Sequence, residues 1–188
     1  MKRLLIDVIA TMVVLLLAMV VFTLTGWYPI GADVPHYSIT TEALTLLRER
    51  AIRNASAGIK VPPLDDPSWL ISGGADYDAM CTGCHLKPGQ ASSDLSLGLY
   101  PAPPNLTQVD SDHLHTETRE QLAARQFWVI KHGIKASGMP AWGITHDDQR
   151  IWEMVAFLQK LPELSSDQYQ ILSGQSHKIR HESPNQEQ

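Results

Sequence analysis

Two cysteines and a histidine stand close enough together in the sequence to act as one chemical unit. They form Cys81-Thr82-Gly83-Cys84-His85, and Cys81 and Cys84 are the only cysteines in the chain. This C-x-x-C-H spacing is typical of covalent c-type haem attachment. The two thiols can add to the two vinyl groups at one edge of a porphyrin, and the imidazole of His85 can bind the iron as the proximal ligand. We therefore expect one covalently bound haem c.

Three other kinds of site use cysteines at this spacing. A structural disulfide would leave His85 unexplained. A thioredoxin-like redox pair needs a strand before the motif, whereas a helix is expected there. A zinc site needs further ligands at metal spacing, and three crowded ligands do not easily form a tetrahedral site. Haem attachment is the interpretation that uses all three residues.

The second axial ligand of the iron must come from elsewhere in the chain. Met139 lies in a loop between two expected helices, within Ser137-Gly138-Met139-Pro140, where small residues let the backbone come close. Met80 lies next to the first cysteine, on the proximal side, and Met154 lies at a core-like position where methionine usually packs. His132 is the runner-up, although its place at a helix end also suits a favourable charge on the dipole. We expect Met139 to be the ligand, and His/Met ligation raises the reduction potential into the range of cytochrome c carriers.

Three helices are expected to position these residues. The first begins at Asp66-Pro67, an N-cap followed by proline, and runs toward the first cysteine. The second begins at Thr118, with Gln121 completing a capping box, and ends at Gly133. The third begins at Thr145 and ends before Pro162. No alternating strand pattern of useful length appears, so the expected class is all-α, with long loops around a cofactor that supplies part of the core.

Two glycines lie inside the first of these helices. Gly73 and Gly74 each cost around 1 kcal/mol relative to alanine in a helix interior. We expect a compensating reason such as the close approach of another helix.

The N-terminus contains an apolar segment of transmembrane length. Asp7 is the only charged residue between Leu4 and Leu24, and a helix of this length spans a hydrocarbon core of roughly 30 Å. Lys2 and Arg3 precede the segment, so the positive-inside bias places residues 1–3 in the cytoplasm and the rest of the chain outside. A cleaved signal peptide is the alternative, but no small-x-small cleavage pattern follows. We expect an uncleaved anchor over residues 4–25 in the cytoplasmic (inner) membrane, with the haem domain in the periplasm.

Composition and charge narrow the remaining possibilities. The chain has 188 residues and a formal net charge of −5, so it lacks the basic footprint of a nucleic-acid-binding protein. Residues 26–65 are expected to form an arm or linker with one helix that begins at Thr40 or Thr41, and residues 66–164 the single folded domain. Residues 165–188 are polar and are expected to form a disordered tail. The histidines outside the motif, His146 among them, are expected at the surface, apart from the runner-up ligand.

The segment from about Asp66 to Leu161 resembles class I cytochromes c, notably the small mono-haem domains of cbb3-oxidase haem subunits. The resemblance rests on the haem motif together with four further stretches: Gly74-Ala75-x-Tyr77 before it, Tyr100-Pro101-Ala102-Pro103-Pro104-Asn105-Leu106 after it, Phe127-Trp128 to Gly133, and Met139-Pro140-Ala141-Trp142. The match ends with Ile151-Trp152 to Leu161.

This resemblance implies a fold in which the first and last helices cross at Gly73 or Gly74, with Trp152 or Phe157 packed at the crossing. It implies that a carbonyl between Pro101 and Pro104 accepts the second ring proton of His85. It also implies that Leu106, Trp128 and Trp142 line the haem pocket, although each is equally compatible with ordinary core packing. The arm over residues 26–65 is not covered by the match.

The expected function is transfer of single electrons, because an iron filled on both axial sides has no open position for bond chemistry. We therefore expect a carrier and not an enzyme. Its redox partners would be a quinol-oxidising complex and a terminal oxidase or reductase if the domain shuttles, or a dehydrogenase or oxidase complex if it is a fixed subunit. The alternative is a haem-based sensor or ligand-binding module in which Met139 dissociates.

Overall fold

The computed structural model describes residues 1–108 and 117–182, and within them the chain is all-helical. It divides into two units, residues 1–37 and 38–188. Its elements are α1 (Lys2–Thr25), α2 (Ser38–Ser56), α3 (Pro67–Met80), α4 (Thr82–His85), α5 (Asp94–Gly98), α7 (Arg119–His132), η1 (Trp142–Ile144), α8 (Asp148–Leu158), η2 (Leu161–Glu163) and α9 (Ser166–Glu182). The absence of strands from the described residues agrees with the expected all-α class.

The first unit consists of α1 and the residues that follow it. Helix α1 is long and apolar enough to cross a membrane by length and composition. It ends at Gly26, which has a positive φ of 64°. Beyond it, the Tyr28 hydroxyl lies 2.9 Å from Nδ1 of His36, and the Tyr28 ring also contacts Tyr37.

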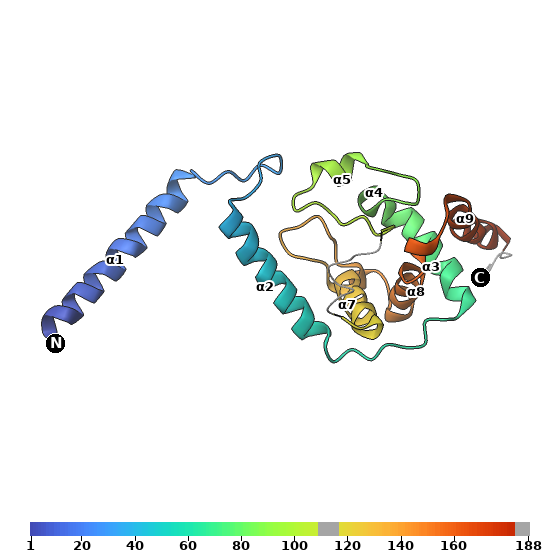
Figure 1. The fold of residues 1–188 in the computed structure, drawn as a ribbon, viewed down its shortest axis with the longest axis horizontal. Coiled ribbons are helices and arrows are strands. Elements are labelled where there is room, and N and C mark those ends of the chain that lie inside the picture. Colours follow the sequence, from blue (N-terminus) through green and yellow to red (C-terminus); the bar gives the residue numbers. More distant parts are fainter. Residues whose placement is uncertain (109–116, 183–188) are drawn as a thin grey trace, which may run out of the picture. The chain divides into compact units, whose positions relative to one another are not determined.

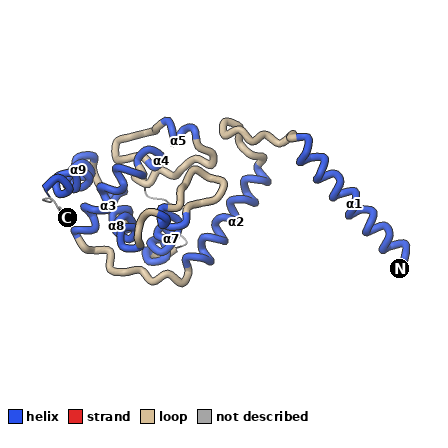
Figure 2. The backbone as a smooth tube through the Cα atoms, turned by 180° about the vertical axis from the view of Figure 1, so that it is seen from behind, coloured by secondary structure: helices blue, strands red, loops and turns tan. Residues whose placement is uncertain are grey.

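In the second unit, α3 and α8 are the central pair (Figure 1). Helix α3 contacts α8 and α9, while α7 contacts α8 and α2, and the view from behind gives the same order (Figure 2). The core between these helices is aromatic. Phe127 of α7 stacks on Trp152 of α8 with ring centroids 4.1 Å apart, and Tyr77 of α3 lies against Phe157 of α8.

The close crossing of α3 and α8 explains the two costly glycines. A Cβ atom on Gly73 would lie 2.1 Å from the carbonyl oxygen of Glu153, and one on Gly74 would lie 3.0 Å from the ring of Phe157. The backbones can approach this closely only because neither position carries a side chain. The expected crossing, with Phe157 as its aromatic residue, is therefore present, and Trp152 packs on α7 instead.

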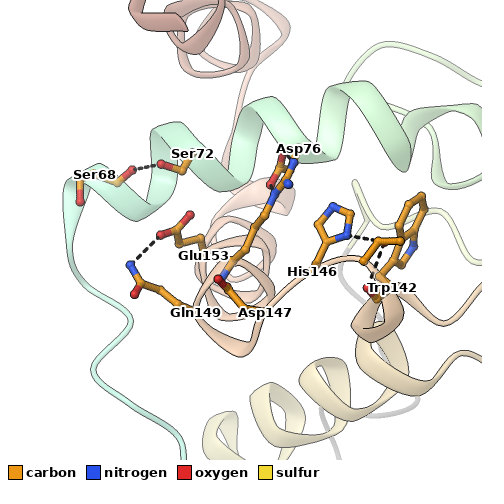
Figure 3. A network of polar contacts seen from close by, with 10 residues as sticks. Ser68, Ser72, Asp76, Trp142, His146, Asp147, Gln149 and Glu153 are labelled. Carbon is orange, nitrogen blue, oxygen red and sulfur yellow. Dashed lines mark hydrogen bonds and ion pairs between the residues drawn. The ribbon is translucent and has the colours of Figure 1, made fainter. Parts of the chain in front are cut away.

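An ion pair with a buried carboxylate joins the same two helices. Arg150 donates from Nε and Nη2 to the two carboxylate oxygens of Asp76, at 2.6 and 2.7 Å, and Asp76 is only 6% exposed. Figure 3 shows Asp76 directed from α3 toward α8 at this point. Because removing one partner would leave a buried charge, the pair fixes how α3 and α8 are rotated against each other.

Two of the three helices expected from capping residues begin where the sequence predicts. The Asp66 carboxylate accepts from the backbone N–H of Ser68, and Thr118 forms the expected capping box with Gln121. The expectation for the third helix needs a correction, because α8 is capped by Asp147 and not by Thr145. The Thr145 hydroxyl instead bonds the ring of His146 and the carbonyl of Trp142.

The C-terminal segment also differs from the expectation of a disordered tail. Residues 166–182 form α9, while residues 183–188 lie outside the described residues. Tyr169 anchors the helix, because its ring is 2% exposed between Tyr77 and Phe157 and its hydroxyl donates to Asp78. One buried aromatic side chain thus orders a segment whose overall composition is polar.

Helix α2 is held on the domain mainly by polar contacts. Arg125 of α7 donates to Glu49 of α2 at 2.6 Å, and Ile52 is the buried apolar residue of the same face. Burial raises the pKa of Glu49, but Arg125 and Arg48 outweigh this effect and bring the pKa below its usual value. The carboxylate therefore stabilises the docked α2 in its charged form.

We expect Gly73→Ala to destabilise the haem-loaded protein by about 2 kcal/mol or more, because its Cβ atom would meet the backbone of α8. Gly174→Ala in α9 is the matched control, since no atom lies within 4 Å of its Cβ position, and it should be neutral or stabilising. Urea unfolding of both variants measures the difference. Equal stability of Gly73→Ala and the wild type would contradict the close crossing.

The Glu49 carboxylate should contribute stability above about pH 4.5, the usual value of its pKa. The contribution should disappear as the pH falls through the lower pKa of the folded state. Because solvent screens this half-buried pair, Glu49→Gln should cost only about 1 kcal/mol at pH 7. Urea unfolding at pH 7 and below pH 4 should show a difference between wild type and variant that shrinks with acid; a constant difference would refute the ion pair.

Candidate functional site

The C-x-x-C-H motif lies where α3 passes into the single turn of α4. The backbone N–H of Cys81 bonds the carbonyl of Tyr77 at 2.9 Å, so the first cysteine caps α3, and Thr82–His85 form the next turn. Both cysteines are free and half-buried. This tight turn brings two thiols and the imidazole of His85 onto one short stretch of backbone.

Tyr77 fixes the exit from this turn. Its hydroxyl donates to the carbonyl oxygens of Leu86, at 2.7 Å, and His85, at 3.2 Å. Leu86 has a positive φ of 67°, a conformation that residues other than glycine rarely adopt. Burial, followed by the nearby Cys81, raises the pKa of Tyr77. The hydroxyl therefore remains a donor, and its two bonds stabilise a strained backbone.

The imidazole of His85 is oriented by a backbone carbonyl. Its Nδ1 atom lies 2.9 Å from the carbonyl oxygen of Pro104. A carbonyl can only accept, so Nδ1 carries the proton and Nε2 keeps a free lone pair. Burial lowers the pKa of His85, and the bond to Pro104 opposes the change in part. The ring is thus held as a neutral imidazole with one nitrogen available to a metal.

The loop that carries Met139 is held by its own backbone. Ile134 donates from its N–H to the carbonyl of Met139 at 3.2 Å, and the Ser137 hydroxyl accepts from the N–H of Met139 at 3.1 Å. Gly133 has φ 64°, and a Cβ atom there would lie 2.7 Å from the carbonyl oxygen of Met139. The glycine therefore permits both the turn and the close approach. Met139 itself is half-buried and packs against the core.

Other residues expected at the site have the surroundings of packing residues. Leu106 and Trp142 are half-buried against the core cluster. Met154 is 2% exposed, in keeping with a core role, and the ring of His132 lies 5.0 Å from that of Trp128. Their roles toward a cofactor remain predictions.

His146 is a feature that the sequence did not reveal. It was expected at the surface, but its Nε2 atom is buried and has no hydrogen-bond partner among the described residues. The ring lies edge-on to Trp142, 5.4 Å between centroids, and Figure 3 shows the two side by side. The Thr145 hydroxyl occupies the other ring nitrogen. A His next to a helix start in a polar stretch gives no sequence signal for such burial.

The residues fit a covalently bound haem better than the competing kinds of site. Burial, then Asp76 and Cys84, raise the pKa of Cys81 to about 12, which disfavours a thiolate ligand for zinc. Among the described residues no group of three or more His, Cys, Asp or Glu could hold a metal ion. Free thiols beside an imidazole with its Nδ1 already occupied are instead what thioether attachment and iron ligation through Nε2 require.

Comparison with known proteins agrees with this site. Residues 70–158 match the family model described as cytochrome C oxidase, cbb3-type, subunit III. The matched segment contains the C-x-x-C-H motif, Pro104 and Met139, and it ends with α8. The comparison with curated proteins gave no match.

Tyr77→Phe should lower the free energy of unfolding by about 1–3 kcal/mol, because the buried carbonyl of Leu86 loses its donor while the ring stays in place; the carbonyl of His85 keeps the N–H of Leu106. Tyr37→Phe is the control, since that side chain is 65% exposed and should be replaceable without loss. Denaturant unfolding of the haem-loaded protein measures both. A Tyr77→Phe variant as stable as Tyr37→Phe would show that the hydroxyl does not support the motif.

Proposed function

We propose that the protein is a membrane-tethered carrier of single electrons, because residues 70–158 match the family model described as cytochrome C oxidase, cbb3-type, subunit III. A domain of this family binds haem c covalently and serves electron transfer. When bound, haem supplies a one-electron couple at its iron. The tether, the axial ligands and the partners are the parts that we propose here.

The hydrogen bond from Nδ1 of His85 to the carbonyl of Pro104 is the observation that carries the proposal. It leaves Nε2 as the ligand atom, next to two cysteines placed for thioether bonds. We assign the covalent attachment to Cys81 and Cys84 and the proximal iron bond to His85. The carbonyl of Pro104 holds the plane of the ring and makes the imidazole a better electron donor.

Met139 is assigned as the distal ligand. Its backbone is held through both its N–H and its carbonyl by Ser137 and Ile134, so the start of its side chain has a fixed position. A thioether ligand stabilises ferrous iron relative to ferric iron and raises the reduction potential. Leu106 and Trp142 are assigned to the pocket wall, where apolar side chains exclude water. With both axial positions filled by side chains, the site transfers electrons and has no place for a substrate, so we do not expect an enzyme.

Helix α1 is assigned as a single-pass anchor in the inner membrane. Lys2 and Arg3 stand before it, and Trp27 and Tyr28 after it, which is the charge and aromatic pattern of a helix with its N-terminus in the cytoplasm. The haem domain then lies in the periplasm. Its partners are redox proteins at that face: a quinol-oxidising complex, a terminal oxidase or reductase, or a dehydrogenase.

Met139→Ala should abolish the weak near-infrared ferric band that sulfur ligation produces and should lower the reduction potential, while haem stays covalently bound. Met154→Leu is the matched control, because this buried methionine packs in the core, and it should keep both the band and the potential. Absorption spectra and a redox titration measure the outcome.

An unchanged band in Met139→Ala would show that another residue binds the iron. Binding of carbon monoxide by the reduced wild-type protein at neutral pH would favour the sensor function over the carrier, because the distal ligand would then dissociate readily.

A further inference from the structure

Helix α2 presents an apolar face that no described residue covers. Ile39, Leu46 and Leu47 are 78%, 58% and 66% exposed, and Leu44 beside them is 50% exposed. Spacings of seven and eight residues place Ile39, Leu46 and Leu47 on one side of the helix. Ala43, which is also exposed, lies about one helical turn after Ile39 and one turn before Leu46, on the same side of the helix. We call the face formed by Ile39, Ala43, Leu46 and Leu47 the outer face of α2.

The opposite side of α2 is the side that packs on the domain. Ile52 and Ser56 are buried, and Glu49 makes its ion pair with Arg125 of α7. These residues follow spacings of three and four, so they form one stripe. Because this stripe already fixes α2 to the domain, the outer face is not needed for folding of the domain and is left for something else.

In the sequence, exposed large apolar side chains are concentrated in the residues that directly follow α1. After α1, twelve large apolar residues are exposed among the residues with described side chains, and eight of them fall within residues 27–47. They are Trp27, Ile30, Val34, Tyr37, Ile39, Leu44, Leu46 and Leu47. Within α2 itself the large exposed apolar residues occupy the half that follows α1, whereas Arg50, Arg53 and Asn54 are exposed in the half that leads to the domain.

A short connection joins α1 to α2. Twelve residues, 26–37, separate the two helices. Even fully extended they reach only roughly 45 Å. An apolar helix face that follows a helix of transmembrane length after so few residues, with Arg50 at its far end, has the pattern of a helix that lies in the membrane interface.

We propose that the outer face of α2 rests on the lipid surface of the membrane in which α1 is anchored. This inference depends on α1 being the anchor of the proposed function and goes beyond it by assigning a role to residues 38–47. The apolar side chains enter the boundary between headgroups and acyl chains, and Arg50, on the same side of the helix, reaches the headgroup phosphates, whereas Arg53 pairs with Glu117 of the domain. Since Glu49 and Arg125 join α2 to α7, the helix then holds the haem domain at a set height and orientation over the bilayer.

The test is spin-label depth measurement on the full haem-loaded chain in phospholipid nanodiscs. The native cysteines are consumed by haem attachment, so a single added cysteine is the only reactive thiol. Leu46→Cys reports the outer face, Leu97→Cys reports an exposed apolar residue of the haem domain, and Val14→Cys reports the middle of α1. Collision rates with oxygen and with a water-soluble nickel chelate distinguish lipid from water.

The proposal predicts that the label at position 46 collides several-fold more with oxygen than with nickel, whereas the label at position 97 shows the reverse. Suppose that the label at position 46 is as accessible to nickel as the label at position 97, while the label at position 14 is still buried in the bilayer. This result would overturn the contact of α2 with lipid and leave the anchor intact. Low access to both reagents at position 46 would also overturn it, in favour of contact with a second copy. A label at position 14 in water would refute the anchor itself.

A second variant excludes an effect of the label at position 46. Ala43→Cys, labelled in the wild-type background and together with Leu46→Gln and Leu47→Gln, compares one reporter with and without the apolar face. Nickel access should rise several-fold in the triple variant. No rise would contradict the proposal, because replacing the apolar side chains at positions 46 and 47 would then not have released the helix from the lipid.

Discussion

Two helices cross at Gly73 so closely that the carbonyl of Glu153 occupies the space where a side chain would begin. Because α3 also leads directly into the C-x-x-C-H turn, the position of this crossing sets the position of the cysteines and of His85. The ion pair between Asp76 and Arg150 fixes the rotation of the pair. Tyr77, from the same helix, then supports the turn through the carbonyls of Leu86 and His85. Helix α3 therefore determines both the packing of the core and the position of the C-x-x-C-H motif.

The two residues that we propose as iron ligands are held largely by backbone groups, with the Ser137 hydroxyl as one side-chain partner of the Met139 backbone. The carbonyl of Pro104 orients His85, and the backbone of Ile134, with the help of Gly133, holds the loop of Met139. Backbone groups keep their position when side chains change rotamer, so the imidazole of His85 and the backbone of Met139 are held in place by the fold itself. Such preorganisation is what an electron carrier needs, because little has to move when the oxidation state changes.

The sequence predicted those parts of the fold that depend on local signals. The caps at Asp66 and Thr118 could be foreseen from short patterns, and the two glycines inside a helix indicated the close approach of another helix. The crossing with the last helix and the bond from His85 to the proline-rich loop were foreseen only through the resemblance to class I cytochromes c. The start of α8 was misplaced because Thr145 and Asp147 are both good capping residues and only the turn at Trp142 decides between them. Helix α9 was missed because its order comes from the burial of one residue, Tyr169, against α3 and α8. Long-range contacts of this kind, like the buried nitrogen of His146, leave no periodic pattern to find.

Covalent haem attachment at Cys81 and Cys84 can be measured by peptide mass spectrometry of the protein matured with a cytochrome c assembly system. We expect the tryptic peptide with both cysteines to carry the mass of one haem, with neither thiol open to alkylation. Recovery of this peptide with two alkylated cysteines, or with a disulfide between them, would show that haem is not attached there.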